Sequence, residues 1–311
     1  MGATNARDAR PRLRVGDPRS LCTLQRAVRV TAPRITLKES WAGLALVSPA
    51  LLIIVVFFVG PLAASVVSAF QSKTGQWTLD NFTKSIELYS SDVMYTAGMV
   101  VLSTVAVGAL SIAIGGYLTL GNHPRTKAML RWLYRWPLFI PFIVSGQLMR
   151  TFLAKNGLLN QLLIGSGILE PLAAQSYLDW RGIVLAFVWK QTPFVALMVA
   201  GAMAAIDSSH IEAARNLGAS RLRILFGIII PQIRRTLMVG LVLSYVTMLS
   251  VLSVPLMINP NSPTMMTVDI AYRINSHGDY GVANALCLVS LVLASIGAWF
   301  YLRHGIARKD V

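Results

Sequence analysis

The sequence predicts an all-α, polytopic integral membrane protein with about six transmembrane helices. The 311 residues are 55% hydrophobic and only 13% charged, whereas about a quarter of the residues in a soluble domain carry charge. The net charge of +15 fits either a nucleic-acid-binding protein or a membrane protein with basic loops. The mean hydropathy of +0.59 favours the membrane protein, so no nucleic-acid partner is expected.

Six apolar segments are long enough to cross the hydrocarbon layer, which requires about 20 residues per helix. The predicted spans, which form a transmembrane domain over residues 41–302, are residues 41–70, 95–120, 129–153, 182–206, 236–257 and 280–302. The third is uncharged only from Trp136 to Met149, and the fourth contains Lys190. None of the six contains Asp or Glu.

Basic residues in the loops predict the orientation of the chain, because short cytoplasmic loops are rich in Lys and Arg. Alternate loops place 21 basic residues on one side and 6 on the other. Both termini are therefore expected in the cytoplasm. Residues 1–40 form a basic tail that we expect to be disordered and attracted to anionic membrane lipid. Residues 303–311 form a short cytoplasmic tail. We expect no cleaved signal peptide, because the first apolar segment is too long.

The cytoplasmic loop at 207–232 predicts two short helices. Ser209 and Glu212 have the spacing of a capping box, which starts a helix. Gly218 suits the left-handed conformation that ends one. Ser220 then caps a second helix, and Pro231 marks a bend into the fifth span. The apolar stripe of this second helix comprises Leu222, Leu225, Phe226 and Ile229. The helical pattern alone fits equally well a hairpin that only anchors the loop at the membrane surface.

The residues of this loop closely resemble the EAA loop of ABC importer permeases. The matching positions are Glu212-Ala213-Ala214, Gly218 at the family spacing, and the terminal Ile228-x-Ile230-Pro231. Ile230 departs from the pattern, since the family usually has Leu there. The resemblance extends from about the first span to the sixth.

This resemblance implies the fold and partners of a type I ABC importer permease, in the inner membrane of a bacterium. The loop would be the coupling helix that contacts a cytoplasmic ABC ATPase dimer through Glu212, Ala213, Ala214, Gly218, Ile228 and Pro231. A second permease subunit, homologous or identical, and an extracytoplasmic solute-binding protein would complete the complex. The chain has no phosphate-binding loop of its own, so ATP hydrolysis is assigned to the partner. We expect no cofactor, metal site or catalytic residue in this chain.

Other resemblances in the sequence favour different substrate classes. Trp189 to Phe194, and Tyr272-Arg273 with Asp279 to Gly281, resemble carbohydrate importers of the maltose type. Gly157 to Asn160 also looks familial. Asn216 to Ser220 is closer to the permeases for polyamines, iron and phosphonates. We expect a small polar solute, with carbohydrate slightly favoured.

Lys190, Gln191, Thr192 and Arg150 are the candidates for the substrate pathway. Lys190 either lines the pathway, extends its stem to the outer interface, or forms a pair across the permease dimer. Gln191 and Thr192 either contact the solute or bond between helices. Arg150 bounds a short apolar stretch, for which an interfacial position is favoured.

Two other function classes compete with an importer subunit. An ion-coupled secondary transporter needs a buried titrating group, and an intramembrane enzyme needs buried catalytic side chains. The lack of acidic residues in the predicted spans weighs against both.

Overall fold

The computed structural model describes residues 37–301 and residue 303, and the regular elements of this part are all helices. The β-type pairing among the described residues is one isolated bridge between Gln71 and Trp77. Most of the basic tail predicted for residues 1–40, and nearly all of the tail at 303–311, lie outside the described residues. The chain divides into two compact units, residues 1–61 and 62–311, which are described separately.

The first unit contains the start of a long apolar helix. It comprises α2 (Leu37–Ile54), a π-helical segment (Val55–Val59) and the first residues of α3 (Gly60–Ala69). Pro61 has no N–H to donate to the carbonyl of Phe57, one turn earlier. The π-helical segment precedes this gap, and the N–H of Gly60 donates to Val55, five residues back. The helix thereby continues through the proline instead of ending at it.

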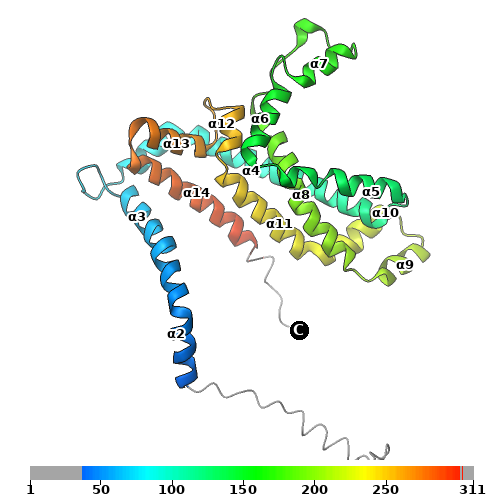
Figure 1. Ribbon diagram of the computed structural model, residues 1–311, viewed down its shortest axis with the longest axis horizontal. Coiled ribbons are helices and arrows are strands. Elements are labelled where there is room, and N and C mark those ends of the chain that lie inside the picture. The colour runs from blue at the N-terminus through cyan, green and yellow to red at the C-terminus, as the bar shows by residue number, and fades with distance from the viewer. Residues whose placement is uncertain (1–36, 302, 304–311) are drawn as a thin grey trace, which may run out of the picture. The chain divides into compact units, whose positions relative to one another are not determined.

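Four long helices form the core of the second unit: α4 (Asp80–Leu120), α8 (Trp180–Ala204), α11 (Ile230–Ser250) and α14 (Tyr280–Tyr301) (Figure 1). Of these, α8 is the most buried. It packs along α4 and α11, and their shared core includes Val107, Val195, Val199 and Ile229. The sixth predicted span coincides closely with α14.

The second predicted span begins too late. The helix starts at Asp80, not at residue 95, and contains 41 residues. At 1.5 Å per residue this is about 62 Å, twice the hydrocarbon thickness of about 30 Å, so part of α4 extends beyond the membrane. Its buried face continues into this polar part at helical spacing through Asn81, Ser85, Tyr89, Asp92, Thr96 and Val100. The added segment includes the buried Asp92, an acidic residue that the predicted span had left outside.

The third predicted span is broken rather than straight. It consists of α5 (Pro124–Leu133), a 3-10 turn (Trp136–Phe139) and α6 (Phe142–Leu153). The helical segments on the two sides of the break are bent by 109°. Pro137 lies inside the turn and Pro141 directly precedes α6. Each removes a backbone donor, which accounts for the interruption.

The fifth span begins earlier and ends earlier than predicted. One helix of 30 residues runs from Arg221 to Ser250 through α10 (Arg221–Ile224), a π-helical segment (Leu225–Ile229) and α11. Pro231 therefore does not interrupt the helix. The N–H of Ile230 donates to Leu225, the same i−5 bond that precedes Pro61. Residues 251 and 252 end the helix, and α12 (Ser253–Ile258) follows as a separate short helix.

The short elements lie toward opposite ends of the bundle (Figure 1). The end with α9 (Ser208–Asn216), α10 and α5 is called the α9 end. The end with α12 and α13 (Met266–His277) is called the α13 end. The segment after α6 adds α7 (Leu158–Gly165) and a 3-10 turn (Pro171–Ala173).

Candidate functional sites in the coupling loop and the buried polar groups

The first helix of the loop starts at a different cap from the one predicted. The carboxylate of Asp207 accepts from the N–H of Ser209 at 2.9 Å, and α9 begins at Ser208. Hydrogen bonds from the backbone and hydroxyl of Ser209 lower the pKa of Asp207. The predicted capping box of Ser209 and Glu212 is wrong, because a helix that starts at Ser208 places Glu212 beyond its first turn. Glu212 is exposed instead.

The turn after α9 has the predicted conformation. Gly218 has φ of +78°, in the left-handed region. The N–H of Ala219 donates to Ala214 at 3.0 Å, and that of Gly218 to Arg215 at 2.9 Å, so the last carbonyls of α9 are satisfied. Ser220 accepts from the N–H of Arg223 at 3.4 Å and caps the next helix, as predicted.

Only part of the predicted coupling surface is exposed. Ala213 and Glu212 lie on the outer face of α9, whereas Ala214 packs against the core with Ile211. Leu217, which the sequence did not single out, is 88% exposed at the tip of the loop. Its position directly before the turn glycine is the feature of the sequence that could have indicated an exposed tip residue. Among the remaining predicted coupling residues, Ile228 is half-buried and Pro231 is exposed.

The predicted apolar stripe of the second helix is divided between the core and the surface of the chain. Leu225 and Ile229 are buried, together with Ile224. Leu222 and Phe226 are 67% and 62% exposed. Ile224, Leu225 and Ile229 thus form the side that packs on the core, and Leu222 and Phe226 lie on a side that the described chain leaves uncovered.

Lys190 is buried inside the bundle, with 7% of its surface exposed. Its ammonium donates to the carbonyl oxygens of Pro137 at 2.7 Å and Leu138 at 3.2 Å. It also lies 5.2 Å from the centre of the Phe142 ring. This places the charge at the break in the third span, where its hydrogen bonds are made within the chain.

The other pathway candidates do not converge with Lys190 on one site. Gln191 donates to the carbonyl of Ser244 on α11 at 3.4 Å. Successive residues of a helix are rotated by about 100°, so Lys190 and Gln191 contact different neighbours. Thr192 is buried, and its hydroxyl has no hydrogen-bond partner among the described residues. Arg150 is exposed in the last turn of α6.

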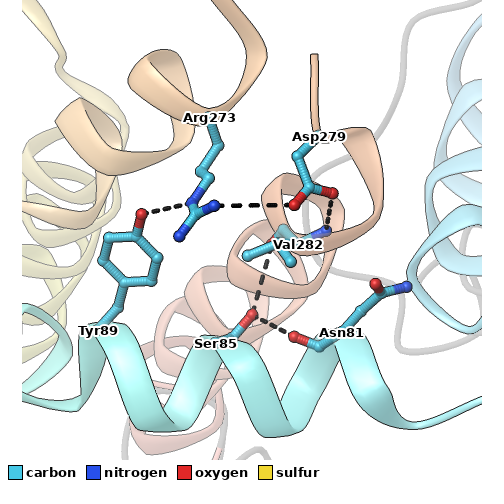
Figure 2. Close-up of polar contacts among 6 residues, drawn as sticks. All are labelled: Asn81, Ser85, Tyr89, Arg273, Asp279 and Val282. Carbon is cyan, nitrogen blue, oxygen red and sulfur yellow. Dashed lines mark hydrogen bonds and ion pairs between the residues drawn. The ribbon is translucent and has the colours of Figure 1, made fainter. Parts of the chain in front are cut away.

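The α13 end contains a polar network that joins three helices (Figure 2). Arg273 donates to the hydroxyl of Tyr89 on α4 and forms an ion pair with Asp279 at 3.8 Å. Asp279 also accepts from the N–H of Val282 at 3.4 Å, at the start of α14. On α4, the hydroxyl of Ser85 lies 2.7 Å from the carbonyl of Asn81 and 3.5 Å from that of Val282. The sugar-permease-like residues Arg273 and Asp279 thus hold α13 and α14 against α4.

Two buried carboxylates lie beside this network. Asp92 accepts from the N–H of Thr264 at 3.0 Å and the hydroxyl of Ser262 at 3.2 Å. Asp269 is 7% exposed, and one of its oxygens has no partner among the described residues. Burial raises the pKa of Asp269 to about 7, with a further increase from Asp92 and an opposing effect of Arg273. Sequence reasoning missed both residues because they fall outside the predicted spans.

Asn160 belongs to the stretch Gly157 to Asn160, which resembled the family, and its contacts are structural. Its amide donates to the carbonyls of Gln175 at 2.7 Å, Lys155 at 2.8 Å and Ala154 at 3.3 Å. These bonds tie the start of α7 to the loops around it. Across the described residues, no group of three or more His, Cys, Asp or Glu side chains is placed to hold a metal ion.

Comparison with known families decides the assignment. The family described as "Binding-protein-dependent transport system inner membrane component" matches residues 111–305, well over half of the chain. The chain belongs to this family. The permease is thus a transporter subunit rather than an enzyme, and the ATPase of such a system is a separate subunit. An ABC ATPase and a solute-binding protein are its partners.

Similar proteins and structures cover most of the permease. It is 29% identical to the trehalose/maltose transport system permease protein MalF of Thermococcus litoralis, over 71% of this chain and 76% of that protein. It is 27% identical to the sulfoquinovosyl glycerol transport system permease protein SmoG of Agrobacterium fabrum, over 83% and 88%. A bacterial alginate ABC transporter has a chain with a TM-score of 0.73 and 20% identity, over 88% of this chain and 98% of that one. This last likeness supports the fold alone.

Proposed function

We propose that the permease imports a small polar solute, and that this solute is a carbohydrate. A solute-binding protein delivers the solute at the α13 end, and an ABC ATPase dimer drives alternating access from the α9 end. A second permease subunit, identical or homologous, completes the pathway. Both chain termini lie in the cytoplasm of a bacterium with the permease in its inner membrane, since the loops richer in Lys and Arg are on that side.

The observation that carries this proposal is the exposed tip of the coupling loop. Glu212, Ala213 and Leu217 face outward, while Ile211 and Ala214 tie the same helix to the core. A rigid short helix with a fixed inner face and an open outer face can transmit a displacement of the ATPase to α8 and α11.

The preference for carbohydrate comes from the relatives. MalF and SmoG are named for sugar and sugar-glycerol transport, and the Trp189 to Phe194 stretch resembles permeases of the same type. The residues from 216 to 220 remain the argument for polyamine, iron or phosphonate. We propose Arg150, which is exposed in the single chain, as a residue that meets the solute in the assembled pathway. For Gln191 and Thr192 we propose a supporting position between helices.

The test is uptake by the complete transporter, with permease, ATPase and binding protein reconstituted in proteoliposomes. ATP-dependent uptake of a labelled disaccharide, with none of spermidine, supports the carbohydrate assignment. Uptake of spermidine alone would assign the polyamine alternative. Uptake that persists without the ATPase would contradict the importer mechanism.

A matched pair of variants tests the coupling role of the α9 tip. Leu217→Asp is expected to reduce ATPase association and uptake. Leu172→Asp changes an equally exposed leucine, 97% exposed in the 3-10 turn after α7, and should leave ATPase association unchanged. Equal effects of both substitutions on ATPase association would remove the support for this docking site.

A further inference from the structure

A groove lies on the surface between α4 and the segment formed by α10, its π-helical continuation and α11. Its volume is about 780 Å³, and its walls are almost entirely apolar. The α4 wall includes Val105, Ala109 and Ile112. The opposite wall includes Leu222 and Phe226, the two exposed side chains of the predicted apolar stripe.

Two glycines of α4 set the shape of this groove. A Cβ on Gly108 would lie 3.3 Å from Leu241, and one on Gly116 would lie 3.1 Å from Leu225. The leucines therefore reach the α4 backbone at these two points. Between them, Ala109 and Ala113 are small and exposed, so the surface stays hollow there.

One end of the groove is basic. Arg221 and Gly121 both line it, and the Cε atom of Lys127 lies 3.4 Å from the position of a Cβ on Gly121. Within the described side chains, neither cation has an acidic partner within ion-pair distance. The other end, near Thr104, has no charged side chain in its lining. The groove is thus apolar along its length and positive at the α9 end.

The groove is longer than the hydrocarbon part of one leaflet. Thr104 and Gly121 both line it, and the 17 helical steps between them span about 26 Å. Half of the hydrocarbon core is about 15 Å. An acyl chain can therefore lie along the apolar part while a phosphate reaches the basic end.

We propose that this groove binds one anionic phospholipid from the leaflet at the α9 end. Its acyl chain lies between Phe226 and Ala109, and its phosphate lies beside Arg221 and Lys127. Both Arg221 and Leu222 directly follow Ser220, the cap after the Gly218 turn. The bound lipid therefore contacts the helix that supports the coupling loop, and it links membrane composition to the position of α9.

Photolabelling of the complete transporter tests this proposal independently of the transported solute. The transporter is reconstituted in nanodiscs with photoactivatable phosphatidylglycerol or photoactivatable phosphatidylcholine, and the labelled peptides are identified by mass spectrometry. We expect phosphatidylglycerol to label peptides from residues 104–121 and 221–226 in preference to phosphatidylcholine.

Substitutions at both ends of the groove make the test specific. Ala109→Phe fills the apolar part and is expected to abolish this labelling, whereas Leu110→Phe, at an exposed neighbour outside the lining, should leave it unchanged. Arg221→Gln and Lys127→Gln should each weaken the preference for phosphatidylglycerol about fivefold. Arg125→Gln serves as the matched control, because Arg125 neither lines the groove nor is among the atoms nearest to a Cβ on Gly121.

Three results would overturn the proposal. One is equal labelling by the two lipids. Another is labelling that Ala109→Phe does not change. The third is efficient disulfide cross-linking of Ala109→Cys to a cysteine in the second permease subunit, which would assign the groove to a protein helix.

Discussion

The ammonium nitrogen of Lys190 on α8 lies 2.7 Å from the carbonyl oxygen of Pro137 in the broken third span. In a continuous helix that oxygen would accept from residue 141, but residue 141 is proline and has no N–H. The N–H of Ile140 makes a 3-10 contact to the same oxygen at 3.3 Å. Lys190 thus supplies a strong donor at the point where the proline removed one.

Lys190→Met is expected to destabilise the permease by about 1.5 to 3 kcal/mol, the usual contribution of a hydrogen bond from a charged group. Thermal unfolding of the purified complex in detergent measures this change. Thr192→Val is the matched control on the same helix, because the Thr192 hydroxyl is buried with no partner among the described residues. If the Lys190→Met variant unfolds like the wild type and only its uptake is altered, a direct contact of Lys190 with the solute is favoured instead.

Gly218→Val is expected to disturb the coupling loop without preventing membrane insertion. No described atom lies within 4 Å of a Cβ added at Gly218, so the effect comes from backbone conformation and not from a clash. A β-branched residue at φ of +78° is strained by about 1 to 2 kcal/mol. ATPase association should fall, while Gly218→Asn, which tolerates this conformation, should retain most of it. Equal loss in both variants would contradict the conformational explanation.

Asp207→Ala is expected to fray the start of α9 more than Glu212→Ala does. Asp207 is the residue that caps α9, and its charged form makes the cap. Because the cap lowers its pKa, its contribution is complete above the ordinary value of 3.8 and is lost as the pH falls below it. Hydrogen exchange of the amides at 208–212 measures this fraying. Faster exchange in Glu212→Ala than in Asp207→Ala would instead support the capping box of Ser209 and Glu212.

Asp269→Asn is expected to stabilise the permease at pH 8 by roughly 1 to 3 kcal/mol and by less than half of that amount at pH 5. A carboxyl whose pKa is raised from 3.8 to about 7 in the folded chain favours folding while protonated. That contribution is complete below pH 3.8 and is lost as the pH rises from 3.8 to about 7. The charged groups around it are Asp92 on α4 and Arg273 on α13.

The measurement for Asp269 is the unfolding temperature between pH 5 and pH 8. Glu87→Gln, at an exposed position of α4, is the control and should keep the wild-type slope. A slope that is the same in Asp269→Asn and in the wild type would show that another group causes it.

Local chemistry explains which features were predictable. Gly218 and Ser220 act on atoms a few residues away, so the turn and the second cap could be predicted from their spacing. The number of membrane segments follows from apolar length alone, which also made α14 predictable almost to the residue.

Tertiary contacts explain what was missed. The carbonyls bonded by Lys190 lie more than 50 residues away in the chain, and no local pattern points to them. The early start of α4 was missed because its first four turns bury polar side chains, such as Asn81 and Asp92, against α13 and α14 rather than apolar ones against lipid. The capping role of Asp207 was missed because Ser209 and Glu212 have the spacing of a capping box.

Site-specific cross-linking of the complete transporter is the most direct test of the claim that α9 couples this permease to an ATPase. Cysteines are placed at Ala213 and Leu172 in a chain with Cys22 and Cys287 changed to serine, and each carries a photoreactive maleimide. The account predicts that Ala213→Cys cross-links to the ATPase and that Leu172→Cys does not. Cross-linking of the ATPase from Leu172→Cys, or its absence from Ala213→Cys in an assembled complex, would contradict the account.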